Sequence, residues 1–553
     1  METRPWHKNY DYVVPTSIRF PKFPVQNFLH LAASQYPFKP ATDFYGSQIT
    51  FSGLRKQTLR LANALVKLGV VKGDRVALAL PNCPQYIIAY YAALSAGAIL
   101  VNMNPLYTHD ELKFMLENTG TKILITFDAV LAVMRPLAKE LNLKLIVTRV
   151  TDFITGMPAS NAKTLELEEG WKHFSEIIDG CTDTRLPRVE LTPADPALIQ
   201  FTGGTTGLPK GALLTHGNVV AASLQCSLWG SSIVNHTPIS ERNLLAIIPF
   251  FHIYGNIVGM NWAMLNMATQ VILPKFEIDE VLGVIQRVNQ FTFFPAVPTM
   301  ITAMVNHPKA GELNMDQRFR FFNSGGARMP AELIARVKDM GINYGEGWGM
   351  SETASLGISN PLMACRTGAI GVPITENDVR LVDIENAKEE VKPGEPGEIL
   401  IKGPSVMQGY WNNPEETKNQ LSEGWLHTGD IGQADEDGYI YIVDRKKDMI
   451  IAGGFNIYPR EVDEVLYQHP KVAEAVTVGI PDEYRGEPVK AFIVLRPGET
   501  ATDKEIAEFC RTKLAAYKVP KQVEFRESIP KSAVGKILRK ILRDEEIAKK
   551  QKN

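Results

Sequence analysis

Short apolar runs alternate with helical segments along the first two thirds of the chain. Residues 54–68 carry apolar side chains at helical spacing and stop at Gly69, and residues 75–80 form an apolar run typical of an interior strand. A second helix at 86–96 and a second strand at 122–126 follow. Strands that alternate with helices predict parallel sheets covered by helices, and therefore an α/β fold. After a polar, loop-like stretch at 151–196, the alternation returns at 244–248, 270–273 and 291–294.

The pattern changes after about residue 373, where short strands and turns predominate up to a charged segment at 444–448. We predict a large N-terminal domain of residues 1–446 that contains several subdomains, the last a small β-rich one at about 373–446. Residues 447–553 predict a small α+β domain. Its expected elements are strands at 472–478 and 489–494, a helix at 503–515, a strand at 523–525 and a helix at 537–549.

Composition and charge exclude several function classes. The chain has 553 residues, which argues for more than one folding unit, and its 45% hydrophobic and 22% charged residues are typical of a globular protein. A formal net charge of −2 gives no electrostatic reason to expect general binding to nucleic acid or to an anionic membrane. Any phosphate-binding function must therefore come from a local site.

Cysteine usage and the apolar runs bear on the cellular compartment. Five cysteines lie far apart with no CxxC pair, which indicates reduced, mostly buried thiols of an intracellular protein rather than a disulfide framework or a zinc site. The N-terminus lacks the apolar core of a signal peptide, and the longest apolar stretch, residues 86–101, is shorter than the roughly 20 residues that span a bilayer. We expect a cytoplasmic protein in which 86–101 is a buried helix that runs into a strand; peripheral membrane contact stays open.

A run rich in glycine and threonine, residues 202–211, follows a predicted strand at 198–201. Its four glycines let the backbone come close to a ligand, and its three threonines and backbone N–H groups can donate to phosphate oxygens. Lys210 adds a positive charge. The run is not a Walker A loop, since Pro209 precedes the lysine and Gly211 follows it. These residues predict a phosphate-binding loop, with a flexible surface loop as the alternative.

Residues 202–218 resemble the signature loop of the adenylate-forming superfamily, which contains acyl-CoA synthetases, the adenylation domains of peptide synthetases, and luciferases. Seven further motifs occur in the superfamily's order, so the resemblance spans nearly the whole chain. They are residues 249–252, 324–327, 344–353, 427–430, 444–448, 453–459 and 530–536. Within the superfamily, residues 202–207 and 101–107 look most like bacterial and archaeal long- and medium-chain fatty-acyl-CoA ligases.

The resemblance implies a site for ATP and Mg²⁺. It assigns the phosphates to the glycine- and threonine-rich loop, the adenine to two glycine-containing segments, and the ribose to a later Asp and Arg. The residues so assigned to the nucleotide are Thr202, Gly203, Gly204, Thr205, Thr206, Gly207, Lys210, Gly326, Ala327, Gly347, Trp348, Gly349, Ser351, Asp430, Arg445 and Lys536. Thr206 and Glu352 are implied for Mg²⁺, which prefers hard oxygen ligands and phosphate partners.

The chain departs from the superfamily pattern at two of these positions. Trp348 stands where tyrosine is more frequent, and Ser351 where threonine is usual. Because tryptophan offers a larger stacking face than tyrosine, we still expect Trp348 to stack on adenine. Taken alone, Trp348 equally fits a core position, Gly325 and Gly326 a plain turn, and Asp430 a cap or turn residue.

The catalytic residues that the resemblance implies are Lys536, His252, Thr206 and Glu352. Lys536 aligns with the lysine that reaches the carboxylate and the α-phosphate, where a positive charge stabilises the charge that builds up as carboxylate attacks phosphorus. His252 is placed where the acyl pocket meets the thiol tunnel, and there it gates access. Taken alone, His252 fits a satisfied core histidine, and the basic residues around Lys536 fit a solvated helix face.

The acyl group and coenzyme A are assigned to further residues. The acyl pocket is implied at His252, Tyr254, Gly255, Asn256 and Gly325, and it should include residues around Trp229, 252–259, 297–300 and 324–326. The pantetheine arm of CoA is implied to pass Gly453, Gly454 and Phe455. The superfamily rotates its small domain about a hinge, which makes residues 447–553 a mobile domain and Lys447 its hinge. Taken alone, Lys447 belongs to an exposed charge run at a boundary.

We therefore expect an acyl-CoA synthetase that converts a medium- or long-chain fatty acid, ATP and CoA to acyl-CoA, AMP and pyrophosphate through an acyl-adenylate. Two alternatives remain. One is a ligase of the same fold that takes an aromatic or branched acid or delivers to a carrier-protein thiol; the other is a non-catalytic nucleotide or acyl-adenylate binding protein. Intact Lys210, Glu352, Asp430 and Lys536 argue against the second. We expect small-molecule partners and no nucleic acid, and a homodimer stays open because related long-chain ligases are often dimers.

Overall fold

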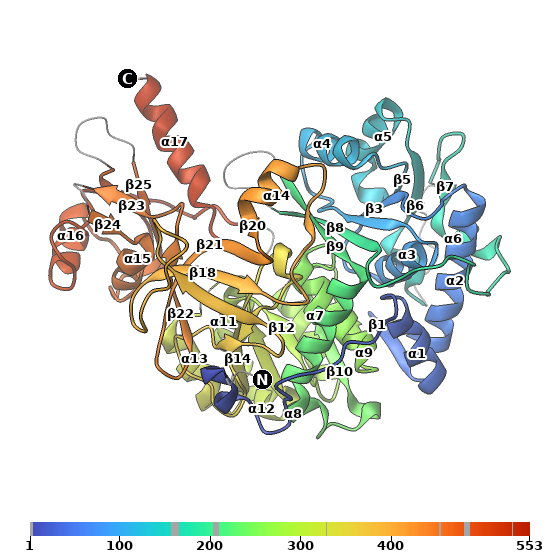
Figure 1. The fold of residues 1–553 in the computed structure, drawn as a ribbon, viewed down its shortest axis with the longest axis horizontal. Helices are drawn as coiled ribbons and strands as arrows, with labels where there is room; N and C mark the ends of the chain where they lie inside the picture. Colours follow the sequence, from blue (N-terminus) through green and yellow to red (C-terminus); the bar gives the residue numbers. More distant parts are fainter. Residues whose placement is uncertain are drawn as a thin grey trace. The chain divides into compact units, whose positions relative to one another are not determined.

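The structure is a computed structural model that describes residues 4–155, 165–202, 209–327, 329–452, 455–480, 487–532 and 535–552 (Figure 1). The chain divides into two compact units. The first contains Met1–Gly204, Leu208–Asp378 and Lys402–Gly424, and the second contains Val379–Ile401 and Trp425–Asn553. The domain boundary predicted at Lys447 lies inside the second unit and stays a prediction.

An eight-stranded sheet is the largest sheet of the first unit. Its strand order is β19-β9-β8-β4-β3-β5-β6-β7, and neighbouring strands are parallel from β8 to β7. β8 and β9 are antiparallel, as are β9 and β19. The strands are β3 (Arg75–Ala79), β4 (Ile99–Asn102), β5 (Ile123–Phe127), β6 (Lys144–Thr148), β7 (Lys172–His173), β8 (Pro196–Thr202), β9 (Lys210–Thr215) and β19 (Gly409–Tyr410). Parallel strands joined through helices confirm the predicted α/β fold class.

Apolar side chains attach the helices to this sheet. α3 (Pro84–Ser95) is buried along its whole length and runs on to β4, as the apolar stretch 86–101 predicts. α2 (Phe51–Lys67) ends before Gly69, whose φ of +94° favours glycine. Leu116 of α4 and Met134 of α5 join Leu124 of β5 in one buried cluster. The other helices of this part are α4 (His109–Thr119), α5 (Leu131–Glu140) and α6 (Phe174–Asp179).

Two further sheets belong to the first unit. One has the order β10-β11-β1-β2, and the other β12-β13-β14-β15-β16. β12, β13 and β14 are parallel, so their carboxyl ends meet at one edge. The strands are β1 (Pro40–Phe44), β2 (Ser47–Thr50), β10 (Asn243–Ala246), β11 (Thr269–Ile272), β12 (Phe294–Ala296), β13 (Phe321–Ser324), β14 (Asn343–Trp348), β15 (Ile358–Ser359) and β16 (Val372–Pro373). The helices include α1 (Asn27–Gln35), α7 (His216–Trp229), α8 (Ser231–Val234), α9 (Trp262–Leu265), α10 (Ile278–Arg287), α11 (Pro298–Asn306), α12 (Met315–Arg318), α13 (Ala331–Asp339) and α14 (Pro414–Gln420).

The second unit contains antiparallel strands followed by an α+β part. β18 and β22 both pair antiparallel with β21. Near the C-terminus β25 and β26 are antiparallel and β26 and β27 parallel, and α15 packs on β25 through a cluster that includes Val462 and Val472. The elements are β17 (Asp378–Val382), β18 (Gly397–Lys402), β21 (Trp425–Ala434), β22 (Ile440–Arg445), β23 (Ile450–Ala452), β24 (Phe455–Ile457), α15 (Pro459–Tyr467), β25 (Val472–Gly479), β26 (Val489–Leu495), α16 (Asp503–Arg511), β27 (Gln522–Phe525) and α17 (Arg539–Lys552).

Two predicted elements differ from the structure. The stretch 151–196, predicted to be loop-like, contains β7 and α6, whose Phe174 and Ile178 are buried. A helix of 6 residues has too few turns to display a helical period within a polar sequence. The helix predicted at 503–515 is α16, which ends at Arg511 and passes into turns.

The structure also shows the state of the cysteines and the length of the apolar helices. All five cysteines are free, and all are buried except the half-buried Cys365, which agrees with the prediction of reduced, mostly buried thiols. Over the part of the chain that the structure describes, no helix combines the length and the apolar character needed to cross a bilayer.

Candidate active site

The predicted phosphate loop joins two antiparallel strands of the large sheet. β8 ends at Thr202 and β9 begins at Lys210, and these two residues are direct partners in the strand register. The run at 202–211 is therefore a hairpin connection whose two ends lie side by side. Gly203, Gly204, Thr205, Thr206 and Gly207 lie outside the described residues, so the roles predicted for them stay predictions.

Lys210 has a carboxylate partner that the sequence analysis did not identify. Its ammonium group forms an ion pair with Glu416 on α14, and both side chains are about three-quarters buried. The same Nζ lies 5.6 Å from the ring centre of Tyr410. Pro414 at the first turn and the Asn413 cap, which accepts from the Glu416 N–H at 3.1 Å, indicate a helix start in the sequence. They give no indication that this helix lies beside the loop.

Glu352 lies in a short 3₁₀ turn after β14, with 5% of its surface exposed. Its carboxylate accepts from the hydroxyl of Tyr410 at 2.8 Å, and its carbonyl accepts from the Met407 N–H at 2.8 Å. Burial raises the pKa of Tyr410 above its ordinary range, and the Glu352 charge adds to the shift. The Tyr410 hydroxyl therefore stays protonated. Ser351, predicted near the α-phosphate, is half-buried in the same turn.

The two segments predicted to hold adenine meet at the carboxyl ends of β13 and β14, where Ser324 and Glu346 are register partners. Gly326 has a φ of +78°, which favours glycine, and it is exposed together with Ala327. A Cβ on Gly349 would lie 1.3 Å from the carbonyl oxygen of Ser355, so that position excludes every larger residue. The exposed Gly326 and Ala327 therefore leave open surface beside the ends of β13 and β14.

Trp348 and Gly347 are the last residues of β14. Trp348 is only half-buried, which differs from the fully enclosed core tryptophan that the residue alone also allowed. A Cβ on Gly347 would lie 2.5 Å from a side-chain carbon of Leu356. The indole therefore has open surface next to a tightly packed backbone, an arrangement that suits stacking on a flat ring.

The residues predicted for the acyl pocket lie around a π-helical turn, Gly255–Asn261. The Nδ1 atom of His252 accepts from the Tyr254 N–H at 3.2 Å, and His252 is half-buried. The hydroxyl of buried Tyr254 donates to Asn323, whose backbone and side-chain oxygens both lie 2.9 Å away. The tyrosine ring also closes over Gly325, where a Cβ would lie 3.2 Å from it. Asn256 is fully buried and donates to the Phe250 carbonyl at 3.3 Å.

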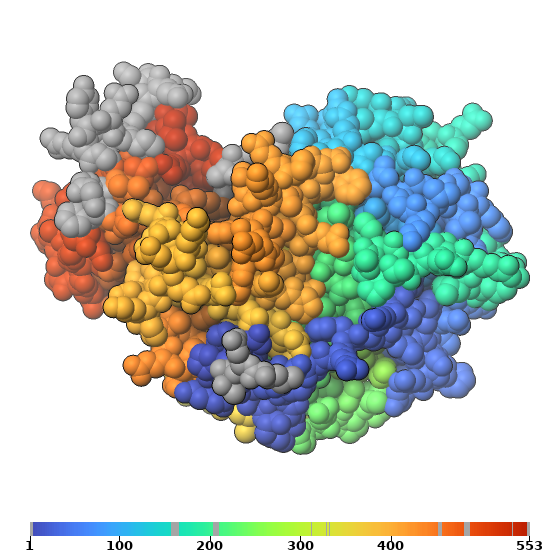
Figure 2. All heavy atoms as spheres, viewed as in Figure 1, coloured from blue at the N-terminus to red at the C-terminus, as the bar shows by residue number. Residues whose placement is uncertain are grey.

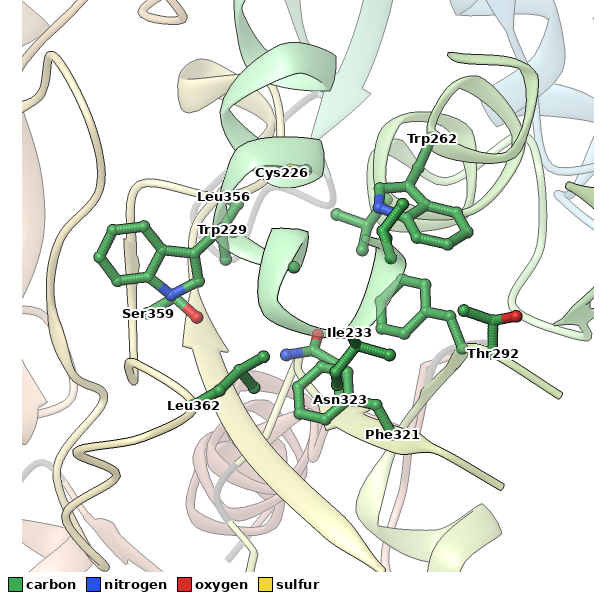
Figure 3. A pocket seen from close by; sticks show the side chains of 14 residues that line it. Cys226, Trp229, Ile233, Trp262, Thr292, Phe321, Asn323, Leu356, Ser359 and Leu362 are labelled. Atoms are coloured by element: carbon green, nitrogen blue, oxygen red, sulfur yellow. The ribbon is translucent and has the colours of Figure 1, made fainter. Parts of the chain in front are cut away.

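An apolar cavity of about 40 Å³ lies beside these residues in the first unit. Trp229 from α7, Trp262 from α9, and Phe321 and Asn323 from β13 line it (Figure 3). The five residues predicted for the acyl pocket are not among its lining residues, although Tyr254 contacts the wall through Asn323. Trp229, around which the pocket was also predicted, is held by a hydrogen bond from its indole N–H to the Asn360 carbonyl at 2.9 Å.

Asp430, Arg445 and Lys536 come together within the second unit. Asp430 on β21 and Arg445 on β22 are register partners and form an ion pair at 3.3 Å. Burial and, to a smaller extent, the Arg445 charge lower the pKa of Lys536 to about 7, while the Asp430 charge opposes the shift. Lys447 and Asp448 also act on Lys536. The structure thus groups three residues that the sequence analysis assigned to ribose binding and catalysis.

The predicted hinge and CoA tunnel are only partly described. Lys447 is exposed in the turn between β22 and β23, and Phe455 is the first residue of β24. Gly453 and Gly454 lie outside the described residues. Their assigned roles stay predictions.

Comparison with known proteins decides the family. Residues 29–411 match the model of the AMP-binding enzyme family, and residues 461–536 match the model of the AMP-binding enzyme C-terminal domain. The chain belongs to the AMP-binding enzyme family. It is an adenylate-forming ligase, as its ordered motifs predict, and the C-terminal match ends at Lys536.

Relatives of this AMP-binding enzyme include several ligases. The chain is 39% identical over 557 residues to a long-chain-fatty-acid–CoA ligase of Bacillus subtilis (strain 168), with 98% of each chain covered. It is 35% identical over 511 residues to a feruloyl-CoA synthase of Amycolatopsis sp, with 92% of this chain and 96% of the relative covered. A solved structure of O-succinylbenzoate coenzyme A synthetase from Bacillus subtilis, in complex with ATP and magnesium ion, matches with a TM-score of 0.78 and 27% identity over 94% of this chain and 99% of that one.

Proposed function

We propose that this AMP-binding enzyme is a fatty-acid–CoA ligase that joins a medium- or long-chain fatty acid to CoA and converts ATP to AMP and pyrophosphate. The observation that carries the proposal is the grouping of Lys536 with Asp430 and Arg445, because it puts a titratable cation beside a predicted ribose-binding pair. The acid class is supported by full-length similarity to a long-chain-fatty-acid–CoA ligase and by the apolar cavity beside Tyr254.

Two half-reactions make up the proposed activity. In the first, a carboxylate oxygen of the acid attacks the α-phosphorus of ATP, pyrophosphate leaves, and an acyl-adenylate forms. Lys536 stabilises the negative charge that develops there, and Lys210 and the hairpin loop hold the departing pyrophosphate. In the second, the CoA thiol gives up its proton and attacks the acyl carbon, and AMP leaves. Asp430 and Arg445 hold the ribose through both steps.

The residues present fit a magnesium ion. The buried Glu352 carboxylate is a hard oxygen donor fixed by Tyr410, and Mg²⁺ is usually held by one or two carboxylates together with substrate phosphates. Within the described ranges, no three His, Cys, Asp or Glu side chains gather as a ready-made metal cage. Glu352 and Thr206 would hold the ion, which would neutralise charge on the phosphates. Ser351 and Lys210 bind and orient the nucleotide.

We infer further that residues 447–553 form a mobile domain that turns about Lys447 between the half-reactions. Support comes from the exposed turn at Lys447 and from the two separate family matches, which stop at residue 411 and resume at 461. One orientation brings Lys536 to the reacting phosphate, and the other presents Gly453, Gly454 and Phe455 to the pantetheine arm. Such a rotation keeps the hydrolysable adenylate away from water.

An aromatic acid is the second candidate substrate. The feruloyl-CoA synthase relative and the indole and phenyl rings around the cavity favour it. A long flexible acyl chain and a flat aromatic ring need cavities of different shape. The acid that the enzyme activates therefore distinguishes the two candidates.

ATP–pyrophosphate exchange over a series of acids tests the proposal. We expect exchange to increase from acetate towards medium and long fatty acids and to stay low with benzoate and ferulate. Exchange with the aromatic acids alone would select the second candidate, and absence of exchange with every acid would leave a nucleotide-binding protein. Lys536→Ala should abolish exchange and spare thioester formation from supplied acyl-adenylate. Lys540→Ala, at an exposed lysine in the first turn of α17, is the matched control.

A further inference from the structure

A short segment of the first unit contacts two of the side chains assigned to the phosphates and their metal, Lys210 and Glu352. We call residues 409–420 the brace; it consists of β19, a turn and α14. Its Glu416 pairs with Lys210, and its Tyr410 donates a hydrogen bond to Glu352 at 2.8 Å. One segment thus touches a cation and a carboxylate that come from distant parts of the chain.

Backbone hydrogen bonds attach the brace directly to the end of the phosphate loop. β19 pairs with β9 at Ala212 and Leu213, close to Lys210. The Trp411 N–H donates to the Gly211 carbonyl at 2.8 Å, one residue beyond Lys210. The Tyr410 N–H donates to the Thr417 hydroxyl at 2.8 Å, which joins the strand of the brace to its helix. The two contacting side chains are therefore mounted on one hydrogen-bonded frame.

Close packing holds the two halves of the brace together. A Cβ on Gly409 would lie 2.6 Å from a side-chain carbon of Thr417, and its φ of +151° is also unfavourable for larger residues. The indole N–H of Trp411 donates to the Asn118 carbonyl at 3.1 Å, which anchors the turn to the large sheet's helix α4. The outer face of α14 reaches the surface, shown in orange (Figure 2), where Glu415 is exposed while Glu416 is turned inward.

The two contacts act on groups that need orientation. Lys210 is a point charge on a flexible stem, and its pairing with Glu416 restricts where the ammonium group can lie. Glu352 is buried, and one of its carboxylate oxygens accepts a hydrogen bond from the Tyr410 hydroxyl at 2.8 Å, which restricts the rotation of the carboxylate. Partners of a metal-binding side chain set its geometry and commonly change metal affinity when removed.

We propose that Tyr410 and Glu416 are positioning residues: Tyr410 orients Glu352 towards the metal-bound phosphates, and Glu416 holds Lys210 against them. The inference rests on the proposed function, because it takes Lys210 and Glu352 to bind the phosphates and Mg²⁺. Neither Tyr410 nor Glu416 is assigned a contact with the substrates. A purely structural brace would affect the stability of the fold and leave metal and nucleotide affinity in the folded protein unchanged.

Mn²⁺ binding to the full chain tests the Tyr410 contact. Free Mn²⁺ is measured by electron paramagnetic resonance with a non-hydrolysable ATP analogue present, so the readout does not depend on turnover. We expect Tyr410→Phe to weaken Mn²⁺ binding about tenfold in protein that circular dichroism shows to be folded at the assay temperature. Tyr45→Phe is the matched control, because Tyr45 also donates to a carboxylate, Glu280, at 3.0 Å in another part of the unit. Equal Mn²⁺ affinity in wild type and Tyr410→Phe would overturn the assignment of Tyr410.

Nucleotide affinity tests the Glu416 contact. We expect Glu416→Ala to raise the Kd for the ATP analogue and the KM for ATP about tenfold, and Glu416→Asp to recover most of this loss because it restores a charged partner for Lys210. Glu415→Ala, at the exposed neighbouring carboxylate, should leave both within twofold. An unchanged or lower Kd in Glu416→Ala would show that the ion pair does not position Lys210, as would a failure of Glu416→Asp to recover it.

The two levels of the proposal fail separately. If no acid supports pyrophosphate exchange in the wild type, the proposed ligase function fails, while the Mn²⁺ and nucleotide measurements still decide the role of the brace. If exchange is normal and both variants bind Mn²⁺ and nucleotide like the wild type, the brace assignment fails and the ligase function stands.

Discussion

The pH dependence of adenylation should report the state of Lys536. Burial and the Arg445 charge lower its pKa to about 7, and the protonated form is the one that can stabilise charge at the α-phosphate. For free enzyme with this pKa, about half of the lysine is charged at pH 7, about a tenth at pH 8 and about a hundredth at pH 9. We therefore expect kcat/KM for pyrophosphate exchange to fall about fivefold from pH 7 to pH 8 and about tenfold for each pH unit above 8.

Bound substrates should shift the alkaline limb of the pH profile to higher pH. The carboxylate of the acid and the phosphates of ATP bring negative charge to Lys536 and raise its pKa, so kcat should decline at a higher pH than kcat/KM. Arginine stays protonated over the whole range, so Lys536→Arg should lack the alkaline limb even though its absolute rate is lower. The assay is exchange from pH 6 to 9.5 with saturating Mg²⁺.

Two results would refute this reasoning. A wild-type kcat/KM that stays constant up to pH 9 would mean that Lys536 keeps an ordinary pKa or takes no part in the step. The same alkaline limb in Lys536→Arg would assign the titration to another group. Lys540→Arg, at the exposed lysine on α17, should reproduce the wild-type profile.

Three further outcomes follow from the contacts in the two units. Asp430→Ala should raise the KM for ATP about 10- to 100-fold, because charge-assisted hydrogen bonds to the ribose are lost; an unchanged KM would remove Asp430 from the nucleotide site. Trp229→Phe should shift exchange towards longer or bulkier acids, because the smaller ring enlarges the apolar cavity; an unchanged acid profile would mean that the cavity takes no part in acyl binding. Asp463→Ala should destabilise the second unit by about 1–3 kcal/mol in urea unfolding, since it removes the nearer ion-pair partner of the partly buried Arg539 and leaves the longer ion pair with Asp448 at 3.9 Å, whereas an unchanged stability would show that the pair contributes nothing.

Local patterns carried much of the architecture. The helix at 54–68 and the apolar strand at 75–80 appear as α2 and β3, because helical spacing and a short apolar run are both properties of neighbouring residues. Gly69 ends its helix for an equally local reason, its left-handed backbone. The order of strands in the large sheet has no such signature, since each strand pairs with partners far away in the sequence. α6 was missed because its single apolar face spans too few turns.

The features of the site also divide into those that motifs predict and those that depend on distant residues. The resemblance to ordered superfamily motifs was enough to assign Lys536, Asp430 and Arg445, because each lies in a motif of adjacent residues that can be recognised in the sequence. The motifs could not predict the lowered pKa of Lys536, since burial and the charge of Arg445 on β22 cause it. The apolar cavity lined by Trp229, Trp262 and Asn323 could not be traced from the sequence, because side chains from separate elements enclose it, and the acyl-pocket residues stay a prediction.

By itself, the sequence determined the fold class, the family and the identity of most residues assigned to ATP, because periodicity and ordered motifs are written in adjacent positions. Tertiary structure alone decided which groups hold those residues in place. Glu416 is 206 positions from Lys210, and Tyr410 is 58 positions from Glu352, so neither contact leaves a local pattern. Such pairs arise only when the chain folds and a strand and a helix bring a charge and a hydroxyl to distant partners.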